Sequence, residues 1–282
     1  MHVSQQLVLY YIRTKFKFLS TISKRKAAEH AFELFCTPQV RNKKKLPPIF
    51  EKAEVLNFPF LDYAVTGYRW NHPSEKKILI LHGFESTITN FDRYIKPLIS
   101  LGYEVLGFDA PAHGKSAGKR INAMVYKQLI REIEHRYGPV TNFLAHSLGG
   151  LAVCLYLDET PHDGRWKLVL VAPATETTTA INTFFEILKI DSSVREEFDS
   201  IIQEKSGHPP EWFSINRMAP NINSKTLWLH DKDDQLTPYH DMAPLMQRGF
   251  QHFHFHISEG LGHRRIYRDN KSFKAIISFF ES

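Results

Sequence analysis

The sequence predicts an α/β protein with a mostly parallel central sheet flanked by helices. Short apolar runs of strand length alternate with longer segments of helical periodicity, at regular spacing along most of the chain. Such alternation implies crossover units and parallel strands. Polar side chains follow directly after several of the apolar runs. Because ligands bind beyond the carboxyl ends of the strands in sheets of this kind, these polar side chains are the first candidates for a functional site.

The elements follow one another from residue 52 onward. Two strand-like runs are expected between residues 52 and 70, with a turn near Gly67. The strands expected after them are residues 78–81, 105–108, 140–144, 168–171, 226–230 and 253–257. Helical periodicity predicts helices between them at residues 91–99, 122–136, 151–157 and 239–247, and a last helix closes the chain. The wholly apolar run 78–81 is typical of a central strand covered on both faces.

The alternation stops between Ala174 and Lys225, where about fifty residues hold no strand-like run. Helical spacing appears instead, and the segment is expected to be a helical cap, about residues 174–224, inserted into the main domain. Its aromatic residues Phe184 and Trp212 are candidates for lining a substrate pocket. Ordinary core packing of two helices explains much of the same pattern.

Residues 1–48 are expected to form a basic helical N-terminal extension, with the main domain covering residues 49–282. Residues 1–50 hold ten Lys/Arg and two Asp/Glu, a net charge of +8, whereas the remaining 26 basic and 28 acidic residues give −2. Nucleic-acid binding is not expected, because the main domain carries no basic excess. A solvated charged face is the expected role of the extension. The alternative is weak contact with a membrane surface or a protein.

The composition also bears on the compartment. The sequence has two cysteines, Cys36 and Cys154, which is too few for a disulfide framework. The apolar run Leu7–Ile12 is too short to span a bilayer, and no cleavage site for a signal peptide follows it. These features predict a cytoplasmic protein in a reducing environment.

Ser147 lies where an expected strand meets an expected helix. Small residues surround it at Ala145, Gly149 and Gly150. This spacing is typical of a nucleophile elbow, a tight strand-to-helix turn that exposes a serine hydroxyl. A serine at this place could also be an ordinary helix N-cap.

Four motifs together resemble the α/β-hydrolase superfamily over roughly residues 50–282. The run 145–149 resembles the elbow, with Ala145 in place of the usual glycine. His263 resembles the late catalytic histidine, and Asp234 the acid of an H-G-x-x-D-x-x-x-P turn in which Asp231 replaces the glycine. The run His82-Gly83-Phe84 resembles the oxyanion-hole turn. In addition to these four, the segment 107–116 resembles the family's D-x-P-x-H-G-x-S turn. The order Ser, Asp, His is the order that this fold uses.

The resemblance implies roles for these residues. Ser147 would be the nucleophile, His263 its base and Asp234 the acid, with the backbone N–H groups of Phe84 and Leu148 as the oxyanion hole. Asp233, Asp231 and Glu176 remain alternatives for the acid. His82, Glu85 and His146 are further candidates for the substrate pocket, and His113 is expected to shape a turn.

The function expected from this resemblance is a serine hydrolase acting on a carboxylic ester through an acyl-enzyme, with a small-molecule acyl substrate. Thioesterases, amidases, C–C hydrolases and acyltransferases use the same machinery. A non-catalytic binding module on the same fold is the alternative from another class. No cofactor is expected. His252, His254 and His256 share one strand face, but no carboxylate or thiolate joins them at useful spacing, so no metal site is expected.

Overall fold

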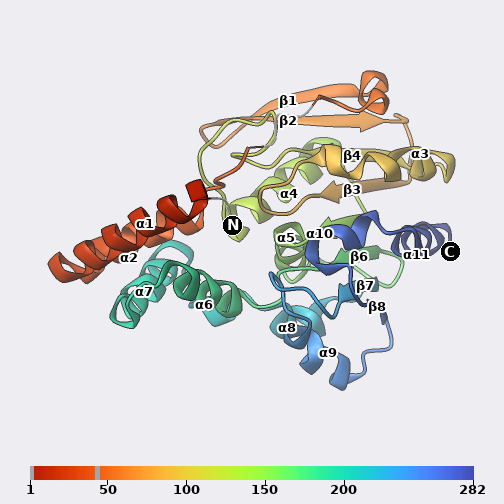
Figure 1. Ribbon diagram of the computed structural model, residues 1–282. Helices are drawn as coiled ribbons and strands as arrows, with labels where there is room; N and C mark the ends of the chain where they lie inside the picture. The colour runs from red at the N-terminus through yellow and green to blue at the C-terminus, as the bar shows by residue number, and fades with distance from the viewer. Residues whose placement is uncertain (1–2, 42–44) are drawn as a thin grey trace. The chain divides into compact units, whose positions relative to one another are not determined.

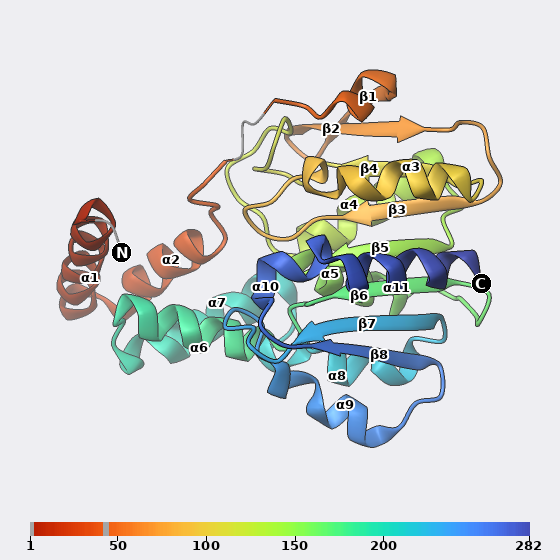
Figure 2. The same ribbon diagram turned by 45° about the vertical axis from the view of Figure 1, so that its right-hand side comes forward.

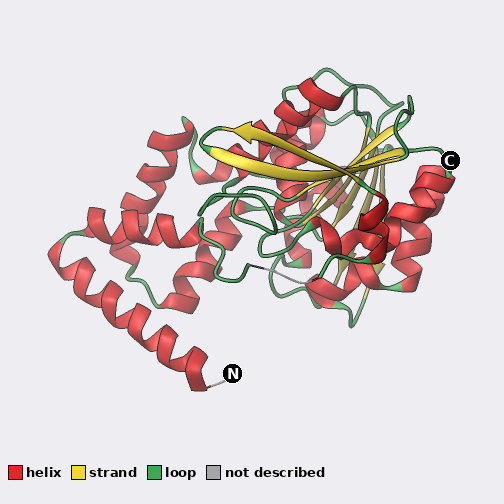
Figure 3. Ribbon diagram, turned by 90° about the horizontal axis from the view of Figure 1, so that it is seen from above, coloured by secondary structure: helices red, strands yellow, loops and turns green. Residues whose placement is uncertain are grey.

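The computed structural model describes residues 3–41 and 45–282 and divides the chain into two compact units. Residues 38–175 and 215–282 form the sheet unit, and residues 1–37 and 176–214 form the helical unit. The described elements of the helical unit are helices alone, apart from one isolated bridge between Glu176 and Ser214 (Figure 3). The N-terminal extension and the inserted segment, far apart in the sequence, therefore belong to the same unit.

The sheet unit contains an eight-stranded sheet in the order β1-β2-β4-β3-β5-β6-β7-β8 (Figure 1). The β1–β2 and β2–β4 pairings are antiparallel, and the other pairings in the sheet are parallel. The strands are β1 Glu54–Phe60, β2 Tyr63–Trp70, β3 Lys77–Leu81, β4 Glu104–Phe108, β5 Asn142–His146, β6 Lys167–Val171, β7 Lys225–Asp231 and β8 Phe253–Ser258. This sheet confirms the predicted fold class.

Helices cover both faces of the sheet. In Figure 2, α3 and α11 lie in front of the sheet, and α4, α5 and α8 lie behind it. The α-helices of this unit are α3 Asp92–Ser100, α4 Ala123–Tyr137, α5 Leu148–Leu157, α8 Ile215–Met218, α9 Ala243–Arg248, α10 Gly262–Arg265 and α11 Asn270–Glu281. Its 3-10 helices are η1 Pro48–Lys52, η2 Ile88–Phe91, η5 Ala219–Asn221, η6 Tyr239–Met242 and η7 Ile266–Arg268. The central strands are buried on both faces, which explains why their sequences are continuously apolar.

Two boundaries around Ser147 differ from the sequence expectation. The strand expected at residues 140–144 spans Asn142–His146, and the helix expected at residues 151–157 begins at Leu148. The reason is register: β5 continues to pair with β6 as far as His146, opposite Val171. A single residue, Ser147, therefore separates strand from helix.

The turn expected near Gly67 is not there. The β1–β2 hairpin turns at Leu61 and Asp62, since Phe60 pairs with Tyr63, and Gly67 lies within β2. A Cβ atom on Gly67 would lie 2.0 Å from the Phe108 ring. This glycine therefore permits the close approach of an aromatic side chain from the neighbouring strand.

The helical unit has its own apolar core. Its helices are α1 Val3–Ile22, α2 Lys24–Phe35, α6 Thr177–Leu188, η3 Ser192–Val194, α7 Arg195–Ser206 and η4 Pro210–Trp212. The ring of the fully buried Phe198 in α7 contacts Phe32 and Phe35 from α2 and Phe184 and Phe185 from α6. Ala27, Ala28 and Ala31 on the buried face of α2 are small enough for neighbouring helices to approach closely. Ser23 caps α2 by accepting a hydrogen bond from the Lys26 N–H.

Charge also joins the two segments of the helical unit. The Arg25 guanidinium in α2 donates two hydrogen bonds to Glu204 in α7 and lies 3.6 Å from Glu197.

Among the helices in residues 3–41 and 45–282, none is long and apolar enough to cross a membrane.

Truncation of Phe198 tests whether the N-terminal helices and the inserted segment form one cooperative unit. We expect Phe198→Ala to cost about 3–5 kcal/mol of the stability of the helical unit, because it leaves a cavity beneath four aromatic rings. In hydrogen–deuterium exchange, amide protection should fall in both α2 and α7 and be retained in β5. The matched control is Phe143→Ala, which removes a buried ring from β5. That variant should show the reverse pattern, and protection lost only in α7 of Phe198→Ala would contradict the shared core.

Candidate active site

Ser147 has the strained backbone of a nucleophile elbow. Its φ is 53° and its ψ is −119°, a conformation that non-glycine residues avoid and that costs on the order of 1–3 kcal/mol. The backbone holds this turn through hydrogen bonds from the Ser147 N–H to the Val171 carbonyl and from the Ala174 N–H to the Ser147 carbonyl. The Ser147 side chain makes no capping bond to α5. The geometry is that of the elbow and not of an ordinary N-cap.

The small residues of the elbow meet different neighbours. A Cβ atom on Gly149 would lie 2.8 Å from the carbonyl oxygens of both Leu81 and His82, so the start of α5 approaches the end of β3 closely. Ala145, by contrast, lies in extended β5, opposite Leu81 and Leu170, with its methyl group fully buried. A glycine is therefore needed after the serine, whereas the position before it accommodates a methyl group.

The turn after β3 packs directly against the elbow. A Cβ atom on Gly83 would lie 2.8 Å from the Cβ of Ser147 and 2.8 Å from Nδ1 of His146. Leu148 is the first residue of α5, so its N–H has no acceptor within the helix. The N–H of Phe84 likewise makes no hydrogen bond within the described part of the chain. The two predicted oxyanion donors are thus available beside Ser147.

Two buried histidines fix the shape of this turn. Nε2 of His82 accepts a hydrogen bond from the Ala110 N–H at 2.9 Å, and Nδ1 faces the Gly83 carbonyl at 2.8 Å. Nε2 of His113 accepts from the Glu85 N–H at 2.9 Å, and Nδ1 faces the Pro111 carbonyl at 2.9 Å. These bonds require neutral rings protonated on Nδ1. Burial lowers the pKa of each histidine to about 4.

These bonds bear on the predicted pocket residues. Both ring nitrogens of His82 are engaged by backbone, and the residue is fully buried. The carboxylate of Glu85 accepts hydrogen bonds from the Gln39 and Val40 N–H groups and so ties down the segment before β1. The geometry therefore argues against a direct substrate contact for His82, and the Glu85 carboxylate is occupied by protein backbone.

Asp234 and His263 form a hydrogen-bonded pair. Oδ2 of Asp234 lies 2.8 Å from Nδ1 of His263 and accepts a further bond from the Thr237 hydroxyl. Oδ1 accepts from the Leu236 and Thr237 N–H groups. Burial alone would raise the pKa of Asp234, but the bonds from His263 and from these amides outweigh it and lower the pKa. Asp234 is therefore an ionised carboxylate that orients the His263 ring.

The other carboxylates weighed as acids have different partners. Asp233 is exposed and accepts a hydrogen bond from the Gly260 N–H at 2.7 Å. Glu176 lies in the helical unit, where it accepts a bond from the Ser214 hydroxyl at 2.6 Å. Of the carboxylates considered, Asp234 is the one bonded to the His263 ring.

Asp231 holds the loop that carries His263. Its carboxylate is buried at the end of β7 and accepts hydrogen bonds from the N–H groups of Leu261 and Gly262, the two residues before His263, at 3.1 Å and 2.9 Å. It also accepts from the Ser258 hydroxyl at 2.6 Å and from the Asp233 N–H at 3.0 Å. Burial raises the pKa of Asp231, and these four donors together lower it below its ordinary value. The sequence assigned no such role to Asp231, although its replacement of a usual glycine was a signal.

His146 links the elbow to the same loop. Its Nε2 lies 3.1 Å from the carbonyl oxygen of His263, and the two rings are 4.7 Å apart. Burial lowers the pKa of His146 to about 3, so the ring is neutral and Nε2–H is the donor. Nδ1 has no hydrogen-bond partner in the described residues and faces Gly83. His146 thus contacts both the turn after β3 and the backbone of His263.

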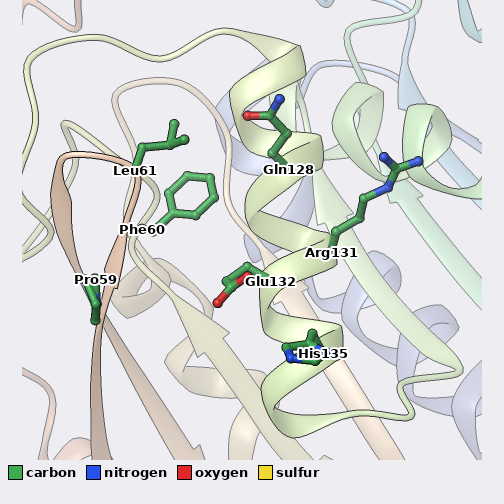
Figure 4. A pocket seen from close by; sticks show the side chains of 7 residues that line it. All are labelled: Pro59, Phe60, Leu61, Gln128, Arg131, Glu132 and His135. Carbon is green, nitrogen blue, oxygen red and sulfur yellow. The ribbon is translucent and has the colours of Figure 1, made fainter.

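The remaining pocket candidates lie in the helical unit. Phe184 packs its ring against Phe35, 5.2 Å between centroids, and Trp212 stacks on His208 at 3.9 Å. A separate cavity of about 560 Å³ lies in the sheet unit between the β1–β2 turn and α4 (Figure 4). It is lined by Pro59, Phe60, Leu61, Gln128, Arg131, Glu132 and His135. None of the predicted catalytic residues lines this cavity, so it is not the candidate active site.

Metal ligation was not expected for the three histidines of the last strand. Nε2 of His252 lies 2.7 Å from the Ile222 carbonyl and is engaged there. Among the residues that the structure describes, no group of three or more His, Cys, Asp or Glu side chains is arranged to hold a metal ion.

The strand order, the strained serine between β5 and α5, and the histidine that follows β8 together define the α/β-hydrolase fold. The solved structures that are similar to this chain share this fold. A family model described as serine aminopeptidase matches residues 72–205.

Curated relatives and solved structures are similar to this chain at low identity. A 2-hydroxy-6-oxononadienedioate/2-hydroxy-6-oxononatrienedioate hydrolase from Cupriavidus pinatubonensis is 23% identical over 251 residues, covering 72% of this chain and 86% of the relative. A probable serine hydrolase from Drosophila melanogaster is 31% identical over 98 residues, which are 33% of this chain and 29% of that protein. The structure of an esterase from Pyrococcus furiosus has a TM-score of 0.61 at 19% identity and covers 86% of this chain and 95% of that one. The comparisons support a hydrolase and leave the bond that it cleaves open.

Replacement of Asp231 tests its role in positioning His263. In Asp231→Asn, an amide NH₂ replaces a carboxylate oxygen that accepts two hydrogen bonds, so two donors lose their acceptor. The loop that carries His263 should therefore shift, and the kcat for an activated acyl ester should fall about 10- to 100-fold. Because the substrate site is untouched, KM should change little. The matched control is Asp233→Asn, two residues away, which loses one exposed bond and should keep kcat within about 3-fold. Equal losses in the two variants would contradict a positioning role for Asp231.

The buried neutral histidines predict a pH dependence of stability. An unfolded histidine titrates near about 6.5, whereas burial lowers the pKa to about 4 in His82 and His113 and to about 3 in His146. Between these values the unfolded chain binds more protons, so stability is lost as pH falls from about 6.5 toward 4, by about 1.4 kcal/mol per pH unit for each histidine. The buried Asp109, whose pKa is raised by burial, opposes this loss.

Urea unfolding between pH 7 and pH 4.5 measures this slope. His113→Gln removes one of the titrating rings and should reduce the slope by about 1.4 kcal/mol per pH unit relative to the unsubstituted protein. If the free energy of unfolding falls with the same slope against pH in His113→Gln and in the unsubstituted protein, His113 is not held neutral by the fold.

Proposed function

We propose that this protein is a serine hydrolase that cleaves carboxylic esters of small acyl substrates through an acyl-enzyme on Ser147. The observation that carries the proposal is the conformation of Ser147, φ 53° between β5 and α5, beside two available backbone amides. The backbone strain at Ser147 costs free energy, and the serine side chain makes no capping hydrogen bond that would offset it. The His263–Asp234 pair at 2.8 Å supplies the base that a serine nucleophile needs.

The first half of the reaction forms the acyl-enzyme. The Ser147 oxygen attacks the ester carbonyl carbon and its proton passes to Nε2 of His263, while Nδ1–H remains bonded to Asp234. The carbonyl oxygen becomes an oxyanion and accepts hydrogen bonds from the Phe84 and Leu148 N–H groups. When the C–O bond breaks, His263 returns the proton to the departing alkoxide, and an alcohol leaves.

The second half repeats these steps with water as the nucleophile. His263 takes a proton from water, the hydroxide oxygen bonds to the acyl carbon, and collapse of the second oxyanion releases the acid and restores the Ser147 hydroxyl. Asp234 remains ionised throughout, in keeping with its lowered pKa, and stabilises the imidazolium that forms twice. Each oxyanion donor is worth about 10²–10³ in rate in enzymes of this kind.

The similarity to the Pyrococcus furiosus esterase favours ester cleavage. A second candidate is hydrolysis of a C–C bond next to a carbonyl group, favoured by the Cupriavidus hydrolase, which matches 72% of this chain. Both reactions use the same serine, base and oxyanion hole. Accumulation of an acyl-enzyme with simple esters favours the first candidate.

Rapid mixing with a p-nitrophenyl ester tests the proposal. We expect a burst of one p-nitrophenol per enzyme, covalent labelling of Ser147 by a fluorophosphonate probe, and neither signal in Ser147→Ala. Asp234→Asn should lower kcat by about 10⁴, because the ring of His263 loses its orienting carboxylate. Asp233→Asn should leave the burst intact. Folded protein that shows no burst and resists the probe would contradict the proposal and favour a non-catalytic binding module.

A further inference from the structure

The helix α1 exposes large apolar side chains to water. Six of the eleven strongly exposed large apolar side chains in the described residues belong to this one helix, with exposed fractions from 57% to 72%. They are Leu7, Val8, Tyr10, Tyr11, Phe18 and Ile22. Isolated exposed apolar residues are ordinary, whereas a concentration on one element marks an interaction surface.

These side chains lie on one side of the helix. At about 100° per residue, Leu7, Tyr11, Phe18 and Ile22 fall within an arc of about 60°, with Val8 and Tyr10 at its edges. We call these six residues the apolar stripe of α1. The opposite side carries Phe16, which is 1% exposed and packs on His30 of α2. The helix therefore has two apolar sides, and the core of the helical unit uses only one of them.

The charged side chains of α1 itself are of one sign. On the helix, Lys17 lies about 80° from Leu7, just beyond Tyr10, and Lys15 lies about 80° to the other side, between Ile22 and Val8, so the two lysines lie near opposite edges of the stripe. Six Lys/Arg and no Asp/Glu occur in residues 1–28. Arg13 and Arg25 are engaged within the helical unit, by the Ile187 carbonyl and by Glu204. Lys24 and Lys26 at the start of α2 are exposed as well.

We propose that the apolar stripe docks the protein onto the surface of an anionic lipid bilayer, with α1 parallel to the membrane plane. Aliphatic and aromatic side chains would enter the boundary between headgroups and acyl chains, where tyrosine is well suited because its ring is apolar and its hydroxyl polar. Lysines at the two edges can lay their methylene chains along the stripe and place their ammonium groups among lipid phosphates.

Two observations favour a lipid surface over another occupant. The stripe extends over residues 7–22, about 24 Å along one side of a single helix, so a flat surface can contact it along its whole length. The lack of any acidic side chain in residues 1–28 matches a uniformly negative surface, whereas a second copy of this helix would place lysines against lysines.

Vesicle co-sedimentation of the full-length protein tests the proposal. Vesicles of phosphatidylcholine with about one third phosphatidylserine should bind the protein, and pure phosphatidylcholine should bind it at least about 10-fold more weakly. The variant Leu7→Ser/Tyr11→Ser/Phe18→Ser should lose binding. Lys15→Gln/Lys17→Gln should weaken binding by about 10- to 30-fold, at roughly one tenfold step or less per lysine near an anionic surface.

The matched control removes exposed apolar side chains elsewhere. Val55→Ser/Leu61→Ser changes two such residues in the sheet unit, 54% and 60% exposed, and should bind vesicles as the unsubstituted protein does. All variants should hydrolyse a soluble ester equally, or, if the chain hydrolyses none, give equal far-ultraviolet circular dichroism. The vesicle result is therefore independent of the proposed function.

Two outcomes overturn the proposal. One is failure of the unsubstituted protein to sediment with anionic vesicles, or sedimentation of the serine variant to the same extent. The other is a dimer in light scattering that the serine variant abolishes, without vesicle binding, which would assign the apolar stripe to contact between copies of this chain.

Discussion

The candidate active site depends on how closely the turn after β3 approaches the turn after β5. Gly83 lies so near Ser147 and His146 that a single added carbon would collide with both, and Gly149 lies equally near the end of β3. This contact brings the turn that carries Phe84 against the elbow that carries Ser147 and Leu148. It is possible because β3 and β5 are parallel neighbours whose carboxyl ends meet at one edge of the sheet. The strain at Ser147 is held by the surrounding hydrogen bonds and not relieved by the side chain.

Buried polar groups keep these turns in place. His82, His113 and His146 are held neutral by burial, and their ring nitrogens, apart from Nδ1 of His146, bond to backbone groups of the loops that surround Ser147. Asp231 performs the same task for the loop of His263 with a charged acceptor. Such groups are costly to bury unless they are hydrogen-bonded. The hydrogen bonds that they make therefore hold the irregular loops around Ser147 and His263 in place.

The helical unit is built from two segments that are far apart in the sequence. The N-terminal helix α2 and the inserted helices α6 and α7 bury their aromatic side chains together around Phe198. The basic residues of the N-terminal segment have different surroundings. Arg25 pairs with acidic residues of α7, whereas Lys17 beside the apolar stripe is exposed and Lys15 is half-buried.

The sequence by itself determined the order of strands and helices and the family motifs, because hydrophobic periodicity and residue spacing are local properties. It also pointed to Ser147, Asp234 and His263, whose roles as a triad remain a proposal. Only the tertiary structure decided which carboxylate meets His263, since Asp231, Asp233 and Asp234 differ by one or two positions and the turn alone sets their directions. The same holds for Gly67, whose role comes from Phe108 on another strand. The shared core of residues 1–37 and 176–214 was likewise invisible in the sequence, because contacts between distant segments leave no local pattern.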